Sequence, residues 1–196
     1  MTALAYRLVF CLGLALFAAA CESAVMRPQF AEFTYGHLAP IDIDVARVEF
    51  VDDYAPPLAE PHVEHLFPVA PAAAVERWVA DRLRPVGVQR TLRVHLEEAS
   101  AVATPLASMG GIDAWFTTEQ VETVAGRIFA RADIVADNGR VEGFATAEVL
   151  RSRTMPEDLT LNERDQLYFE LVEAMMDDFN AIFETNIRTY LRAYVR

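Results

Sequence analysis

The 196-residue sequence contains no lysine, so all 17 of its basic residues are arginines. A Schiff-base nucleophile and a P-loop both require a lysine, and its absence excludes both kinds of chemistry. Glycine is also scarce, at 8 residues, and neither a Gly-x-Gly-x-x-Gly loop nor a Gly-x-Ser-x-Gly nucleophile elbow occurs. We therefore expect a protein that is not an enzyme and that binds no cofactor.

Cysteine is nearly absent as well, and its two occurrences, Cys11 and Cys21, both lie close to the N-terminus. Arg7 precedes a run of 13 apolar and small residues, 8–20. This run is too short to span a bilayer, which takes about 20 residues, and it is typical of an export signal. We expect residues 1–20 to be removed, which leaves Cys21 as the only thiol of the exported protein.

The sequence Ala18-Ala19-Ala20-Cys21 resembles a bacterial lipobox, in which the cysteine thiol receives a diacylglycerol and becomes the new N-terminus. The resemblance implies a lipoprotein whose acyl chains, such as palmitate, anchor it stably because more than one chain enters the bilayer. Ala18 stands where lipoboxes usually carry leucine, and ordinary signal cleavage after Ala20 is the alternative. Glu22 follows the cysteine, and resemblance to sorted lipoproteins implies an outer-membrane location facing the periplasm.

The charge of the chain restricts its partners. The net charge is −12, and removal of residues 1–20, which contain one arginine and no acid, changes it to −13. Nucleic acids and anionic lipid headgroups both require cationic patches, so neither is expected to bind. We expect contact with the membrane through the lipid at Cys21, and a protein partner in the envelope.

The sequence therefore predicts three parts of the chain: a signal peptide at 1–20, a lipidated N-terminus and tether at 21–40, and a single α/β domain at 41–196. Fully extended, the residues from 22 to 40 could reach about 60 Å. The second half of the tether carries three aromatic residues, and we expect it to pack on the domain: Phe30, Phe33 and Tyr35.

The first half of the domain shows two strand patterns and one helix pattern. Alternating apolar residues predict a strand over 41–51, with a phase shift that indicates a bulge. A proline-rich connection over 52–69 leads to a helix over 71–84, which carries one apolar stripe. A second strand is predicted over 90–98, and residues 100–106 are a candidate extension of it.

The second half predicts a hairpin over 121–135 and 141–152, turning at Asp137-Asn138-Gly139. One face of its first strand carries small and apolar residues, which indicates that a helix approaches closely. The other face carries Arg127, Phe129, Arg131 and Asp133 and is expected to be wet or to face a partner. A capping box at 160–163 begins a helix that no glycine or proline interrupts before Arg196.

This element order predicts a two-layer α/β sandwich, in which a four-stranded mixed sheet carries a crossover helix and a long C-terminal helix on one face. A ferredoxin-like arrangement is the competing topology. In its element order behind a lipidated cysteine, the chain resembles the auxiliary lipoproteins of ABC-type lipid transporters and the lipopolysaccharide-assembly lipoprotein. The resemblance extends over the mature domain in topology and carries no binding residue.

Candidate sites are few. His62, Glu64 and His65 could supply metal ligands, but a zinc site needs three or four donors, and polar loop residues are the commoner explanation. The neighbouring acids Asp52-Asp53, Glu97-Glu98 and Asp177-Asp178 point in different directions, so we interpret them as surface charge. The residues that we predict to contact a partner lie in a Gly110-Gly111 loop and at the end of the last helix: Trp115, Tyr190, Leu191 and Tyr194.

The sequence thus favours a non-enzymatic, membrane-anchored accessory lipoprotein of a transport or envelope-assembly complex. One alternative is a periplasmic module that binds a lipid or another apolar molecule over Gly126, Ala130 and Ala132. Another is a metal-dependent hydrolase that would use the two histidines and the glutamate of 62–65.

Overall fold

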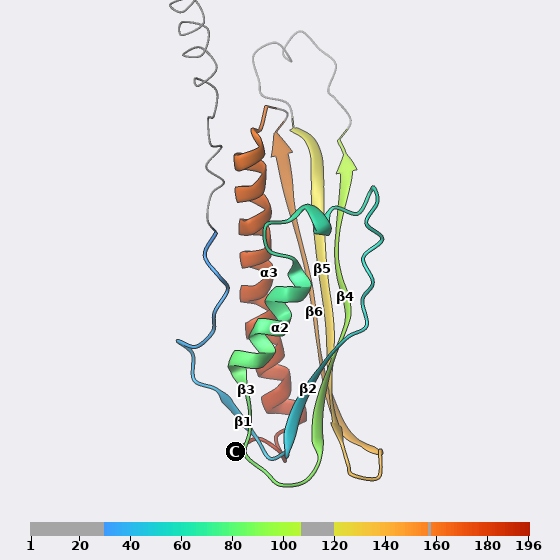
Figure 1. The fold of residues 1–196 in the computed structure, drawn as a ribbon, viewed down its shortest axis with the longest axis vertical. Helices are drawn as coiled ribbons and strands as arrows, with labels where there is room; N and C mark the ends of the chain where they lie inside the picture. The colour runs from blue at the N-terminus through green and yellow to red at the C-terminus, as the bar shows by residue number, and fades with distance from the viewer. Residues whose placement is uncertain (1–29, 107–119, 157) are drawn as a thin grey trace, which may run out of the picture.

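The computed structural model describes residues 30–106, 120–156 and 158–196, which form two layers (Figure 1). One layer is a four-stranded sheet in the order β2-β4-β5-β6, and the other contains two helices. This arrangement confirms the predicted sandwich. The main elements are β2 (Arg47–Asp52), α2 (Pro71–Arg82), β4 (Thr91–Pro105), β5 (Gln120–Val135), β6 (Val141–Pro156) and α3 (Leu161–Tyr190).

The strand directions are those that the sequence predicts. β2 and β4 are parallel, and α2 forms the crossover between them. β4, β5 and β6 follow one another antiparallel as a meander. β4 is one continuous strand, and its register shifts between Leu96 and Glu98. Gly139 has φ +83°, which supplies the positive φ expected of the hairpin turn.

The predicted strand over 41–51 is wrong in one respect, because the chain bends in its middle. β1 (Ile41–Ile43) precedes the bend and pairs in parallel with β3 (Leu83–Pro85), in a separate two-stranded sheet that the sequence did not reveal. α2 therefore ends at Arg82, two residues before its predicted end. The close approach at the bend requires Gly87, where a Cβ atom would lie 2.7 Å from the Val45 amide nitrogen.

The core lies between the sheet and the helices. The even-numbered residues of β5 from Val124 to Ile134 face it and are buried, as the alternation predicts. Trp78 of α2 is fully buried, and its ring packs against Phe179 and Phe183 of α3 with ring centroids 5.3 Å apart in both pairs. Its indole N–H donates to the Asn180 side-chain oxygen at 2.8 Å, so burial leaves no polar atom of this side chain unpaired.

The capping box at the start of α3 is present in full. The Thr160 hydroxyl accepts a hydrogen bond from the Glu163 amide at 3.3 Å, and the Glu163 carboxylate accepts one from the Thr160 amide at 2.8 Å. Hydrogen bonds from the Thr160 hydroxyl and amide lower the pKa of Glu163.

Thr160→Ala is expected to lower the free energy of unfolding by about 1 kcal/mol, because it removes the side-chain cap of the helix. Urea unfolding followed by circular dichroism measures this loss. Because the folded-state pKa of Glu163 lies below its unfolded value, the capping interaction contributes at neutral pH and is lost as the pH falls through that folded-state pKa. The stability difference between wild type and variant should therefore shrink in acid, and a difference that grew there would contradict this reading.

The end of α3 differs from the prediction. The helix stops at Tyr190 instead of continuing to Arg196, and the chain turns back toward β1. The Asp44 amide donates to the Tyr194 carbonyl at 2.7 Å, and the Arg196 amide donates to the Asp42 carbonyl at 2.9 Å. No glycine or proline marks this stop, because tertiary pairing with β1 ends the helix.

Candidate functional site

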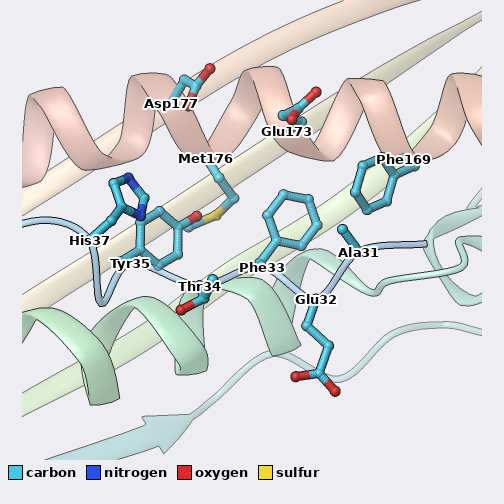
Figure 2. Close-up of a pocket in the computed structure, with 10 residues that line it drawn as sticks. All are labelled: Ala31, Glu32, Phe33, Thr34, Tyr35, His37, Phe169, Glu173, Met176 and Asp177. Carbon is cyan, nitrogen blue, oxygen red and sulfur yellow. The ribbon is translucent and has the colours of Figure 1, made fainter. Parts of the chain in front are cut away.

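Residues 30–39, here called the anchor segment, lie along α3 without regular secondary structure and include a turn at 36–38 (Figures 1 and 2). The rings of Phe30 and Phe33 stack on Phe169 of α3, with ring centroids 5.1 and 5.0 Å away. Tyr35 is only 7% exposed. The prediction that the second half of the tether packs on the domain is therefore confirmed.

Polar contacts fasten the anchor segment to α2. The Asp81 carboxylate accepts hydrogen bonds from the Tyr35 amide at 2.9 Å and from the Thr34 hydroxyl at 3.4 Å. Burial raises the pKa of Tyr35, and the negative charges of Asp177 and Asp81 raise it further. The tyrosine is therefore neutral at physiological pH, as a buried phenol should be.

The anchor segment runs in the same direction as α3. Phe30 and Phe33 contact Phe169 near the start of the helix, whereas the Ala39 carbonyl accepts a hydrogen bond from Arg82, which in turn pairs with Glu184 near the helix end. Followed backward, the anchor segment is therefore directed toward the start of α3 at residue 30.

The pairing of Arg82 with Glu184 is the most buried ion pair of the anchor region, because the arginine side chain is 2% exposed. Removing one partner of a buried pair leaves an uncompensated charge, which costs about 3–5 kcal/mol when both groups are buried. Glu184 is 28% exposed. We therefore expect Glu184→Ala to cost about 2–3 kcal/mol of unfolding free energy, at or just below the lower limit of that range.

Glu173→Ala is the matched control, since Glu173 is exposed on the same helix and forms no ion pair within the described residues. Its effect should stay within about 0.5 kcal/mol. If urea unfolding gave equal losses of unfolding free energy for the two variants, the Arg82–Glu184 pair would make no specific contribution to stability.

A cleft of about 280 Å³ opens between the anchor segment and α3 (Figure 2). Phe33, Tyr35, Phe169 and Met176 give it an apolar lining, and carboxylates stand along it on both sides. No described nucleophile is paired with a base there, so the cleft can accommodate a side chain or a small molecule but offers no catalytic set. The residues that line it are Ala31, Glu32, Phe33, Thr34, Tyr35, His37, Phe169, Glu173, Met176 and Asp177.

The other face of the sheet, here called the open face, bears the odd-numbered residues of β5 and the even-numbered residues of β6 that pair with them. Both helices pack on the opposite face, and no described element covers this one. Leu150 is 67% exposed and Phe144 is 51% exposed, with Phe129 half-buried between them. The prediction of a face that is wet or faces a partner is consistent with this exposure.

Ion pairs hold the arginines of the open face in place. Arg127 pairs with Glu98 and, at 2.9 Å, with Glu148, so it bridges the strands on either side of β5. The guanidinium carbon of Arg131 lies 4.1 Å from the ring centroid of Phe144. Aromatic and arginine side chains that are ordered before binding are common in the centres of protein interfaces.

The predicted partner-binding residues are not brought together. Cys21 and Trp115 lie outside the described residues. Tyr190 is 68% exposed, but Leu191 is fully buried against Gly143, where a Cβ atom would lie 3.2 Å from the leucine. Tyr194 is half-buried beneath Arg90. Leu191 is therefore a core residue rather than a contact, because the chain turns back where a longer helix was predicted.

The residues considered as metal ligands at 62–65 make structural contacts. Glu64 is 3% exposed, and its carboxylate accepts hydrogen bonds from the Tyr54 hydroxyl at 2.7 Å and from the Ala101 amide at 3.1 Å. Burial raises the pKa of Tyr54, and the hydrogen bond to Glu64 raises it further. His65 is exposed, and no group of three potential metal ligands occurs in 30–106, 120–156 or 158–196. Glu64 thus fastens the short 3-10 helix η1 (Glu64–Leu66) to β4.

The adjacent acids diverge as expected. Asp53 contacts His95 at 2.6 Å, whereas Asp52 accepts from the Tyr54 amide at 3.1 Å. His95 of β4 is thus paired with an acid on the adjoining strand end. Asp178 pairs with Arg151 of β6, whereas Asp177 lines the cleft between the anchor segment and α3.

The space proposed for an apolar ligand is occupied by the protein itself. A Cβ atom at Gly126 would lie 2.9 Å from the Met175 methyl carbon, so the methionine side chain rests directly on the strand. Ala130 and Ala132 are fully buried beneath the helical layer. The glycine that suggested a ligand serves instead for close packing of α3 on β5.

Neither a protein-family model nor a curated protein matches the sequence. Three solved structures are similar at low identity. A minor lipoprotein from Acinetobacter baumannii is 11% identical, with a TM-score of 0.39 over 74% of this chain and 92% of that chain. The rare lipoprotein B from Shewanella oneidensis is 12% identical, with a TM-score of 0.36 over 71% and 92%. A Xanthomonas campestris protein of family model DUF330 is 10% identical, with a TM-score of 0.32 over 82% and 93%.

These likenesses are too distant to carry a function to this chain. Of the helices that the structure describes, none is long and apolar enough to cross a membrane.

Proposed function

We propose that the chain is a non-enzymatic lipoprotein of the bacterial cell envelope, acylated at Cys21 and held at the outer membrane facing the periplasm. It serves there as an accessory component of a transport or envelope-assembly complex. The export signal, the single cysteine at the cleavage point and the strongly acidic body support this proposal.

The packing of Phe30 and Phe33 on Phe169 is the observation that carries the proposal furthest. It leaves eight residues, 22–29, between Cys21 and Phe30, and the nine Cα–Cα steps from 21 to 30 reach at most about 30 Å. An acyl chain at Cys21 would therefore hold the body near the bilayer, within reach of a membrane-bound complex.

The open face is the surface that we assign to a protein partner. It combines exposed apolar side chains, Phe144 and Leu150, with arginines that ion pairs keep in fixed positions. The partner surface that fits it is apolar at its centre and carries both charges at its rim.

Leu150→Glu is expected to abolish co-isolation of the partner, because it replaces an exposed apolar side chain in the centre of the contact with a charged one. Affinity isolation of the full-length protein from detergent-solubilised membranes, after crosslinking in intact cells, measures this loss. Val88→Glu is the matched control, since Val88 is 90% exposed in the loop before β4. Equal recovery of one partner with the wild type, Leu150→Glu and Val88→Glu would exclude the open face as the binding surface. Failure to isolate a specific partner even with the wild type would overturn the accessory role.

A further inference from the structure

We infer that the end of the molecule at which α3 begins rests on the lipid surface, with Leu161 as its contact residue. This inference rests on the proposed acylation of Cys21 and adds an orientation to it. The opposite end, which carries the β5–β6 turn, then points away from the membrane.

The course of the anchor segment fixes the orientation. Phe30 stacks on Phe169, and the residues after it proceed toward the end of α3 near Glu184. Followed backward, the described segment is therefore directed toward Leu161 at residue 30. Figure 1 shows the start of α3, the end of β4 and the end of β6 together at that end of the molecule.

The distances along α3 separate the two ends. Phe169 lies eight residues after Leu161, or about 12 Å at 1.5 Å per residue. Tyr190 lies 21 residues after Phe169 in the other direction, or about 32 Å. The nine Cα–Cα steps from Cys21 to Phe30 span at most about 30 Å, which is more than the distance from Phe169 to the start of α3 and less than the distance from Phe169 to its end.

The side chains at this end suit an uncharged lipid surface. Leu161 is 81% exposed, and Leu106, directly after β4, is 39% exposed. The nearby arginines are neutralised in ion pairs: Arg164 with Glu122 at 3.3 Å, and Arg153 with Glu170 at 2.6 Å. With no described arginine free to bind an anionic headgroup at this end, the surface fits zwitterionic headgroups.

Labelling at two positions tests the orientation. Acylation of Cys21 would leave the mature protein without a free thiol, so Leu161→Cys and Asn138→Cys each introduce a single site for a thiol-reactive fluorophore. Both positions are exposed, which spares the core. The full-length, acylated proteins are reconstituted into phosphatidylethanolamine-rich vesicles that contain a headgroup-labelled quencher lipid.

We expect the fluorophore at 161 to lose most of its emission and the fluorophore at 138, in the β5–β6 turn, to lose none. Quenching at 138 alone, at both positions or at neither would overturn the orientation. Mass spectrometry of the same samples distinguishes failure of the orientation from failure of the proposed function. If Cys21 is acylated but the fluorophore at 161 is not quenched, only the orientation is wrong. If Cys21 carries no acyl chain, both the orientation and the proposed function are wrong.

Discussion

Replacement of Trp78 by alanine is expected to cost about 3–5 kcal/mol of unfolding free energy, a large part of the stability of a domain of this size. The indole is fully buried between α2 and α3, where it packs on Phe179 and Phe183. Its removal leaves a cavity where the two helices meet and deprives the Asn180 side-chain oxygen of its donor.

The measurement is urea unfolding of the detergent-solubilised full-length protein, followed by circular dichroism because the substitution removes a fluorophore. Val88→Ala provides the control, since this side chain is 90% exposed and its loss should change stability by less than about 0.5 kcal/mol. A loss below about 1 kcal/mol for Trp78→Ala would mean that α2 contributes little to the core.

Cys21→Ser is expected to release the protein from membranes entirely. A serine hydroxyl does not receive the diacylglycerol, and each buried methylene of the missing chains would have contributed about 0.8 kcal/mol to membrane binding. Cell fractionation follows the location, and mass spectrometry of purified wild-type protein measures the acyl mass.

Cys11→Ser is the matched control, because Cys11 lies in the segment expected to be removed and the mature protein would be unchanged. Wild-type protein with a bare Cys21 would remove the basis for the membrane location. Continued sedimentation of Cys21→Ser with membranes would instead show that the protein or its partner supplies a second attachment.

Local patterns predicted most of the architecture. Alternation in β4, β5 and β6 identified the sheet and its buried face, and the Thr160 to Glu163 capping box located the start of α3 within one residue. These features follow from spacings of two to four residues, which the sequence displays directly.

The features that the sequence did not reveal depend on residues far apart. β1 and β3 are only three residues each, and they exist because they pair with each other. The position at which α3 ends depends on pairing with β1, and the burial of Leu191 depends on the same pairing. A methionine of α3 fills the space over Gly126, and the glycine alone does not tell a ligand from a neighbouring helix.

The return of the C-terminus to β1 has a consequence for biogenesis. Val195 pairs with Ile43, and Arg196 pairs with Asp44, a separation of 152 residues along the chain. β1 is made early in synthesis, and its outer edge is therefore closed only after residues 195 and 196 have been added. Until then that edge is an unprotected template for other strands, so a holding chaperone would have its greatest effect on chains that still lack residues 195 and 196.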